Sequence, residues 1–354
     1  MPIEVAFISV VPSPYQRDLF AALAAHPDIR LRVFYLEAAS PDSPWPEKPL
    51  APYEEILHGV WFPLGTARTH VNWPLPNLDR FDIVVMNTLM SLTAQWLIRT
   101  ALRKKPWCFW GERLSQGGFW HSQLAAPLHR ASAIASIGRF AQCEYVRRFP
   151  EPRHYCIPYF CDLDGFLAAP RRVRDDGKVV FLFCGQMIDR KGVPILLEAF
   201  AKLGDAARLL LVGREADLPA LLAPLPATVR ERCVYAGFQP PEELPRFFAQ
   251  ADVFVLPSRY DGWGVVVNQA VGAGLPVIFS DRVGAGFDLV EHRKNGFMFG
   301  MGNPFELAKW MQHFLNEPAL IEKWGEASRE KARTISPAIG AEKWVAALRE
   351  VLGR

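Results

Sequence analysis

The feature that most constrains the fold is a set of short runs that are apolar almost throughout. The clearest are FDIVVM (81–86), KVVFLF (178–183), ARLLLV (207–212) and ADVFVL (251–256). A strand with one face in water alternates polar and apolar residues, whereas an unbroken apolar run is typical of a strand buried on both faces. Segments with helical 3–4 spacing, such as Ile195–Leu203, lie between the runs. The pattern predicts parallel sheets covered by helices.

The alternation of strands and helices occurs twice, with a polar, basic break at 162–178. We therefore predict an α/β protein of two Rossmann-like, doubly wound domains facing a central cleft. The first domain covers 1–162 and the second 163–335, and the final helix of 336–354 returns to the first domain. The predicted strands are 3–11, 29–37, 81–87, 106–112, 132–138, 154–160, 178–184, 207–213, 234–238, 252–257, 276–280 and 296–300.

Composition excludes several classes of protein. The chain has 354 residues, and its 40 basic and 37 acidic side chains give a net charge of +3, too balanced for a nucleic-acid partner. Its six cysteines form no Cys-x-x-Cys pair, which favours buried thiols in a reducing compartment. The N-terminal segment resembles a strand rather than a leader, and no apolar run reaches 18 residues. We expect a cytoplasmic protein.

The loops that follow the strands are where a ligand should bind. The first, VVPSPYQRDLF (10–20), contains no glycine, so a dinucleotide fingerprint is absent and nicotinamide chemistry is disfavoured. No phosphate-loop motif occurs. Arg17, near the start of the first helix, is a candidate residue on the acceptor side.

The second half of the chain opens with a different loop, CGQMIDRKG (184–192). Gly185 and Gln186 follow the strand, and Arg190 and Lys191 precede the next helix. Two cations beside a helix start favour an anion such as a diphosphate. A solvated basic loop is the alternative.

The stretch PSRYDGWGVVVNQAVGAGLPVI (257–278) places Asp261 in a loop and two amides inside an apolar helix. Gly262, Trp263, Gly264 and Val265 complete the loop and begin the helix. The helical spacing puts Gln269 on the same face as Val265, with Asn268 beside it.

These stretches, with ADVFVLPS (251–258) and EHRKNGFMF (291–299), resemble the donor-site signature of retaining glycosyltransferases of family 4, which have the GT-B fold. The likeness is close over 155–335 and only architectural before that. It implies that Asp261 binds the transferred sugar and Gln269 the ribose, where family members carry two glutamates. Gln186 stands where they carry an arginine. The loop around Phe238 would hold the base.

The resemblance implies that the protein is a retaining hexosyltransferase that moves a hexose from a nucleotide-diphosphate sugar to an acceptor hydroxyl, with no metal or other cofactor. Arg190, Lys191 and the helix start would stabilise the leaving diphosphate. The acceptor, a saccharide or lipid-linked saccharide, would lie on the first domain. Glu112 is the catalytic candidate there, with His70 and His121 as alternatives. Polysaccharide or lipopolysaccharide assembly is the expected setting.

Two questions stay open from the sequence. The segment SLTAQWLIRTALRKKPW (91–107) mixes aliphatic and aromatic residues with cations, which predicts peripheral contact with an anionic membrane, as at the cytoplasmic face of the inner membrane. An amphipathic core helix is the alternative. A nucleotide-sugar hydrolase or epimerase, and a non-catalytic nucleotide-sugar-binding subunit, are the competing functions.

Overall fold

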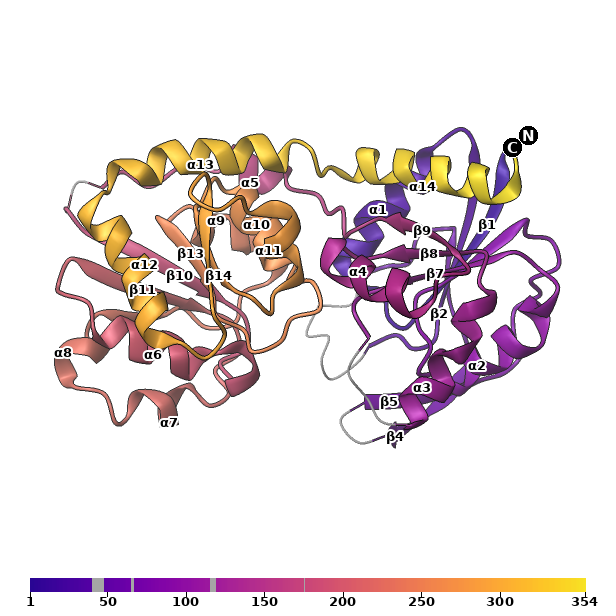
Figure 1. The fold of residues 1–354 in the computed structure, drawn as a ribbon, viewed down its shortest axis with the longest axis horizontal. Helices are drawn as coiled ribbons and strands as arrows, with labels where there is room; N and C mark the ends of the chain where they lie inside the picture. The colour runs from indigo at the N-terminus through magenta and orange to yellow at the C-terminus, as the bar shows by residue number, and fades with distance from the viewer. Residues whose placement is uncertain (40–47, 65–66, 115–118, 175) are drawn as a thin grey trace. The chain divides into compact units, whose positions relative to one another are not determined.

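The computed structural model describes residues 1–39, 48–64, 67–114, 119–174 and 176–354. The chain divides into two compact units (Figure 1). Unit 1 comprises Met1–Cys161 together with Ser336–Arg354, and unit 2 comprises Asp162–Ile335.

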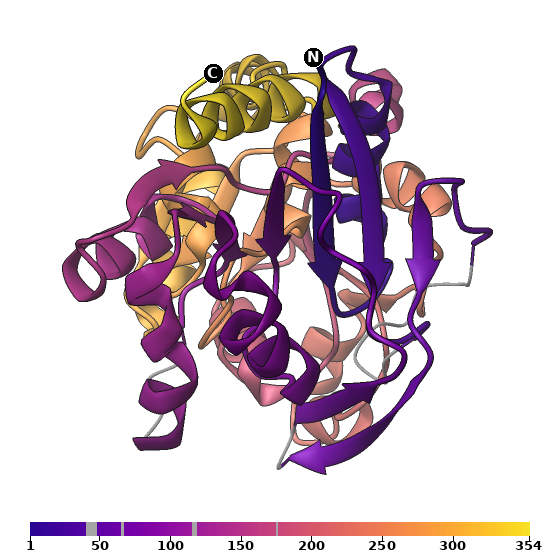
Figure 2. The ribbon, with the colours of Figure 1, turned by 90° about the vertical axis from the view of Figure 1, so that its right-hand side faces the viewer.

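Unit 1 contains a seven-stranded parallel sheet in the order β3-β2-β1-β6-β7-β8-β9. A separate antiparallel hairpin pairs β4 with β5 (Figure 2). The strands are β1 Ile3–Ser9, β2 Ile29–Tyr35, β3 Glu54–Ile56, β4 Gly59–Leu64, β5 Ala67–Asn72, β6 Ile83–Met86, β7 Trp107–Gly111, β8 Ala133–Ser136 and β9 Arg153–Cys156. The helices are α1 Pro14–Ala25, α2 Leu92–Arg99, η1 Ala101–Arg103, α3 Phe119–Ala125, η2 Ala126–Arg130, α4 Arg139–Arg148 and α14 Pro337–Leu352.

Unit 2 contains a six-stranded parallel sheet in the order β12-β11-β10-β13-β14-β15. Its strands are β10 Val179–Cys184, β11 Ala207–Val212, β12 Cys233–Tyr235, β13 Val253–Leu256, β14 Val277–Ser280 and β15 Gly296–Phe299. Its helices are α5 Asp164–Ala168, η3 Asp189–Lys191, α6 Val193–Ala201, α7 Leu218–Leu222, α8 Ala227–Arg230, η4 Pro241–Glu243, α9 Leu244–Phe248, α10 Val266–Gly272, α11 Gly284–Leu289, α12 Pro304–Asn316 and α13 Ala319–Ala332. The predicted pair of Rossmann-like α/β domains is confirmed.

Strand β1 shows why apolar runs form the centre of each sheet. Its side chains alternate between the two faces, so Ala6 and Ile8 enter the core beneath α2 and α4, whereas Phe7 lies on the opposite face. On that face Phe7 packs against Phe20 of α1 and against Trp344 of α14. Both faces of the strand are therefore dry, as its sequence predicted.

The structure corrects three sequence-based expectations. Strands β3, β4 and β5, all within 54–72, were not predicted, because this segment lacks the long apolar runs of the central strands. The polar break at 162–178 contains helix α5, which buries Phe166 against Phe248 at a ring separation of 5.3 Å. Cys143 is exposed, and Cys156 and Cys233 are partly exposed, so only half of the thiols are buried as expected.

No helix within the described ranges combines the length and the apolar character that a membrane crossing requires.

The Trp344 side chain should be the main contribution of α14 to the stability of unit 1. It is almost fully buried, and its ring lies 5.2 Å from that of Phe7 and 5.7 Å from that of Trp110. We expect Trp344→Ala to lower the free energy of unfolding by about 3–5 kcal/mol through lost burial and a cavity. Urea unfolding measures the loss, with Ala346→Ser on the exposed face of the same helix as the control. A loss no greater than that of the control would contradict the packing role.

Candidate active site

The strand order of unit 2 reverses between β10 and β13, which are neighbours in the sheet but not in the sequence. In an open parallel sheet, ligands bind at such a reversal, outside the carboxyl ends of the strands. The loops that follow β10 and β13 are 185–192 and 257–265. They contain most of the site residues predicted from the sequence.

An ion pair joins these two loops. The Lys191 Nζ lies 2.6 Å from the Asp261 Oδ2, and the two side chains are only 18% and 12% exposed. The Ser258 hydroxyl, itself fully buried, donates to the same carboxylate oxygen at 3.4 Å. The structure therefore brings together the predicted cation and the predicted acid at the point where the strand order reverses.

Backbone contacts hold the two loops in register. The Arg259 N–H donates to the Arg190 carbonyl at 2.9 Å, and the Arg190 guanidinium donates to the Tyr260 carbonyl at 3.4 Å. Gly192 lies so close to Pro257 that a Cβ atom would come within 1.9 Å of its carbonyl oxygen, and its φ is 75°. Only glycine fits there, and this close approach places Lys191 opposite Asp261.

The loop that carries Asp261 is also fixed from its other side. Asp261 forms an isolated parallel bridge with Val283, through its N–H to the Arg282 carbonyl and its carbonyl to the Gly284 N–H. Gly264 has a φ of 90°, which turns the chain into α10. Main-chain hydrogen bonds therefore fix the position of the loop residue that carries this carboxylate.

The other predicted donor-site residues lie at the same edge of the sheet. Gly185 uses its N–H to pair with the Val212 carbonyl at the end of β11, and Gln186 follows it, partly buried. Phe238 follows β12 and is 43% exposed. Burial raises the pKa of the neighbouring Cys184 thiol to about 12, so that it is protonated at neutral pH and unreactive.

Trp263 and the two amides of α10 have different roles. The Trp263 indole is buried, and its Nε1–H donates to the fully buried Asn268 Oδ1 at 2.9 Å. Trp263 as a whole is only 1% exposed, and its carbonyl accepts from the Ala285 N–H. The Gln269 Oε1, by contrast, is buried without a hydrogen-bond partner. A buried acceptor of this kind is costly unless a ligand satisfies it.

Unit 1 has a polar contact at the corresponding reversal, between β1 and β6. The Gln16 Nε2 donates to the Asn87 Oδ1 at 2.8 Å, and the Asn87 Nδ2 donates to the Trp110 carbonyl at 2.7 Å. Sequence reasoning missed both amides. The signal for Asn87 was its place directly after the apolar run FDIVVM.

Glu112 follows β7 and lies beside these amides. Burial raises the pKa of Tyr159 well above its usual value, and the nearby Glu112 carboxylate raises it further. The Tyr159 ring packs against Tyr15 at 4.8 Å and against Trp110 at 5.4 Å. Glu112 therefore belongs to a cluster of phenol and amide groups at the carboxyl edge of this sheet.

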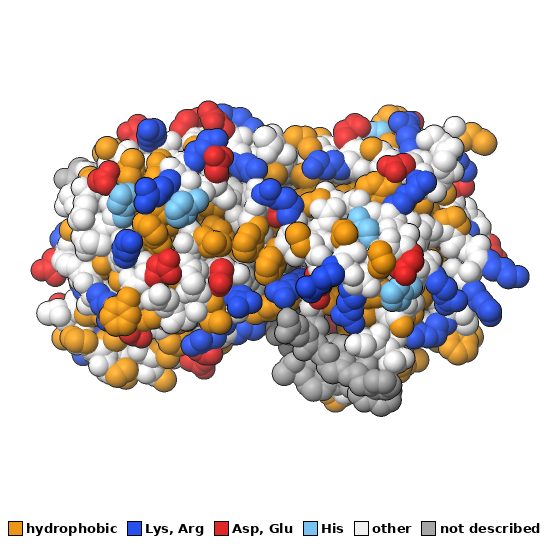
Figure 3. Space-filling model, viewed as in Figure 1, with side chains coloured by type: hydrophobic (Ala, Val, Ile, Leu, Met, Phe, Trp, Pro, Cys, Tyr) orange, Lys and Arg blue, Asp and Glu red, His pale blue; other side chains and the backbone are white. Residues whose placement is uncertain are grey.

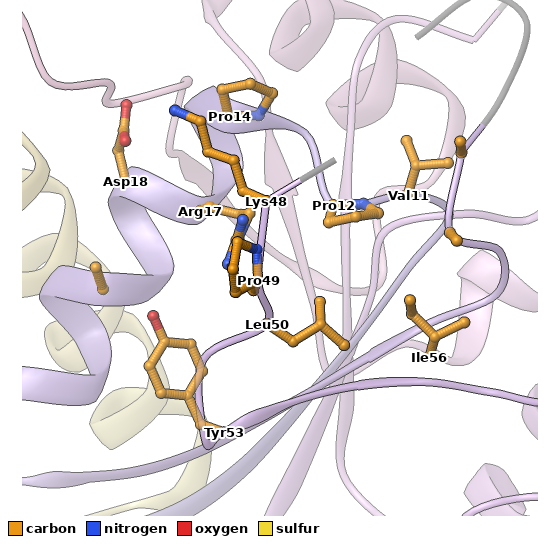
Figure 4. Close-up of a pocket in the computed structure, with 13 residues that line it drawn as sticks. Val11, Pro12, Pro14, Arg17, Asp18, Lys48, Pro49, Leu50, Tyr53 and Ile56 are labelled. Atoms are coloured by element: carbon orange, nitrogen blue, oxygen red, sulfur yellow. The ribbon is translucent and has the colours of Figure 1, made fainter. Parts of the chain in front are cut away.

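Arg17 lines a pocket of about 820 Å³ in unit 1. Figure 4 shows it with Lys48, Tyr53 and several apolar residues. The guanidinium is already bound, since its Nε and Nη2 donate to the Glu54 carboxylate at 2.9 and 2.7 Å and Nη2 also reaches the Pro49 carbonyl. Glu54 further accepts from the Tyr35 hydroxyl. Arg17 thus has a structural role in shaping the pocket wall.

His70 and His121 were the alternatives to Glu112 in unit 1. His70 is buried in β5, with its Nε2 3.3 Å from the Glu37 Oε1. The side chain of His121 lies outside the described part of the structure.

Known proteins resemble the part of the chain that contains these loops. Residues 168–331 match the family described as "Glycosyl transferases group 1". The 2-deoxystreptamine glucosyltransferase of Streptomyces kanamyceticus is 31% identical over 189 residues, covering 49% of this chain and 48% of that protein. The O-antigen chain mannosyltransferase B of Escherichia coli is 28% identical over 178 residues, or 46% of this chain and 47% of that protein. The chain spans about half the length of the curated relatives it matches.

Solved structures resemble the whole chain. Sucrose-phosphate synthase from Thermosynechococcus elongatus has a TM-score of 0.77 at 19% identity, over 99% of both chains. Anabaena Alr3699/HepE in complex with UDP has a TM-score of 0.75 at 17% identity, over 98% of this chain and 100% of that one. The chain therefore has the GT-B fold of two Rossmann-like domains, and the match to the glycosyl transferases group 1 family lies within unit 2.

The two adjacent amides of α10 should respond differently to substitution in the unliganded protein. Asn268→Leu leaves the buried Trp263 N–H without this acceptor and should lower the free energy of unfolding by about 1–3 kcal/mol. Gln269→Leu removes an oxygen that makes no hydrogen bond and should leave stability unchanged or raise it. Urea unfolding of both variants beside wild type is the measurement. Equal losses would show that Gln269 is also a structural amide.

Proposed function

We propose that the protein is a retaining hexosyltransferase that moves a hexose from a nucleotide-diphosphate sugar to an acceptor hydroxyl, without a metal or other cofactor. The observation that carries the proposal is the Lys191–Asp261 pair at the strand-order reversal of unit 2. It supplies a cation for a diphosphate and an acid for sugar hydroxyls at one place. The pair also lies within the region that matches the glycosyltransferase family.

Each part of the donor has a counterpart among the described residues. Lys191 and the exposed Arg190 would hold the diphosphate, because charge-assisted hydrogen bonds to phosphate are strong. Asp261 would accept hydrogen bonds from the sugar. The unsatisfied Gln269 Oε1 would accept one from a ribose hydroxyl. Phe238, exposed after β12, would contact the base.

In the proposed reaction, the bond between the sugar C1 and the diphosphate oxygen breaks as the acceptor oxygen bonds to C1 on the same face. The proton of the acceptor hydroxyl passes to an oxygen of the departing diphosphate, and the nucleoside diphosphate leaves. Lys191 and Arg190 lower the barrier by stabilising the negative charge that develops on the leaving group.

The acceptor would bind to unit 1. Its neutral amides and phenols near Glu112 suit a ligand that is rich in hydroxyl groups, and the pocket beside Arg17 offers further volume. The name of the Escherichia coli relative refers to an O-antigen chain, which supports a saccharide or lipid-linked saccharide acceptor in surface polysaccharide assembly. That setting would place the protein at the cytoplasmic face of the inner membrane.

Lys191→Ala should weaken the binding of the nucleotide. Calorimetry with UDP, GDP and ADP identifies the tightest nucleoside diphosphate, whose dissociation constant should rise about 10- to 100-fold in the variant, since a hydrogen bond to a charged group is lost. Lys178→Ala is the matched control, because Lys178 precedes β10 at the opposite edge of the same sheet and donates to the Asp205 carbonyl. Unchanged binding in Lys191→Ala would refute the diphosphate site.

Gln269 should accept a hydrogen bond from a ribose hydroxyl of the nucleotide. We expect wild type to bind the tightest ribonucleoside diphosphate about fivefold better than its 2′,3′-dideoxy analogue, which corresponds to one hydrogen bond. Gln269→Leu should bind the two ligands equally. If the variant keeps the preference of wild type, another group binds the ribose hydroxyls.

A further inference from the structure

Unit 1 carries a group of exposed apolar side chains on the β4–β5 hairpin and on α2. Trp73 is 75% exposed and Trp96 is 62% exposed, values that are rare for tryptophan in a folded protein. We call the group the aromatic face. Its members are Val60, Phe62, Val71, Trp73, Leu92 and Trp96.

The members of the aromatic face are neighbours. Val60 pairs with Val71 across the hairpin, and Phe62 pairs with Thr69, so that their side chains share one side of the two-stranded sheet. The Thr69 Oγ1 accepts a hydrogen bond from the Leu92 N–H at 3.1 Å, which places the start of α2 against that side. Trp96 lies one helical turn beyond Leu92.

On the opposite side of the hairpin, two polar residues of β5 are buried. His70 and Asn72 are nearly inaccessible, and the Thr93 hydroxyl of α2 donates to the Asn72 Oδ1 at 2.9 Å. The Asn72 Nδ2 also donates to the Leu36 carbonyl. The hairpin therefore packs through His70 and Asn72 of β5, and Val60, Phe62 and Val71 face outward on its other side. Trp61, opposite His70, is 47% exposed and lies under the Arg68 guanidinium.

Basic side chains follow the apolar ones along the exposed side of α2 and the turn after it. Leu92, Trp96, Arg99 and Arg103 recur at helical spacing, and Lys104 follows; all five are exposed. In Figure 3, Lys and Arg side chains lie among hydrophobic ones over the α2 end of unit 1. Tryptophans bordered by lysine and arginine are a combination that favours the headgroup region of an anionic bilayer, where indoles are half solvated and cations meet phosphates.

We propose that the aromatic face and the adjacent Arg99, Arg103 and Lys104 dock unit 1 onto a lipid bilayer with anionic headgroups. The hairpin supplies the inserting apolar groups, and α2 supplies both Trp96 and the charges. The charge complementarity favours a lipid surface over an uncharged partner. This docking is independent of the proposed glycosyl transfer, because it needs neither donor nor acceptor.

The test is co-sedimentation of the full chain with phosphatidylcholine vesicles, with and without an equal part of phosphatidylglycerol. Wild type should pellet with the anionic vesicles and much less with the neutral ones or in high salt. Trp73→Ser with Trp96→Ser, and separately Arg103→Glu with Lys104→Glu, should each lower the vesicle partition coefficient about tenfold or more. All substituted positions are exposed, and thermal melts confirm that the variants fold.

The controls make comparable apolar-to-polar and charge-reversing changes on unit 2. Val173→Ser with Phe305→Ser removes two equally exposed apolar side chains, and Lys294→Glu with Lys323→Glu reverses two exposed cations. Both should bind vesicles as wild type does. Equal binding by wild type and the aromatic variant would overturn the proposal. A second outcome would also overturn it: wild type does not bind vesicles but self-associates in sedimentation velocity, and the aromatic variant does not self-associate. That outcome would identify the aromatic face as an interface between copies of the chain.

Discussion

The ion pair between Lys191 and Asp261 is the interaction on which the candidate site depends. It joins the loops after β10 and β13 at the one position in the unit 2 sheet where the strand order reverses. Both side chains are mostly removed from water, so each needs the other to offset the cost of its own burial. In the proposed function, the Lys191 side chain is already oriented before an anion binds, and the Asp261 carboxylate lies beside it. The same contact therefore organises the loops and sets the charge of the site.

The two units place different chemistry at equivalent positions. Where unit 2 has a lysine and an aspartate, unit 1 has Gln16 and Asn87, joined by a hydrogen bond of 2.8 Å. A neutral amide pair both donates and accepts, which suits hydroxyl groups, whereas a lysine suits a diphosphate. This difference in charge is the structural basis for assigning the donor to unit 2 and the acceptor to unit 1 in the proposed reaction.

Much of the architecture could be predicted because strands buried on both faces must be apolar throughout. All twelve predicted strands are present, with ends that differ by a few residues. The segment 54–72 was missed because β4 and β5 bury polar residues and expose Trp61, Phe62 and Val71. Polar residues of β5 can be buried there only because α2 supplies their hydrogen-bond partners. Local periodicity does not contain that information.

The sequence by itself determined the α/β class and the loops in which Lys191 and Asp261 would lie, since both follow from local patterns of apolar and polar residues. Only the tertiary structure decided which side chains meet. It paired Lys191 with Asp261 across 70 positions and bound Arg17 to Glu54. It also gave Asn268 a partner in Trp263 and left the Oε1 of the adjacent Gln269 without one. The physical reason is that a hydrogen bond or ion pair depends on distances of about 3 Å. Such distances between remote residues exist only after the sheets have formed.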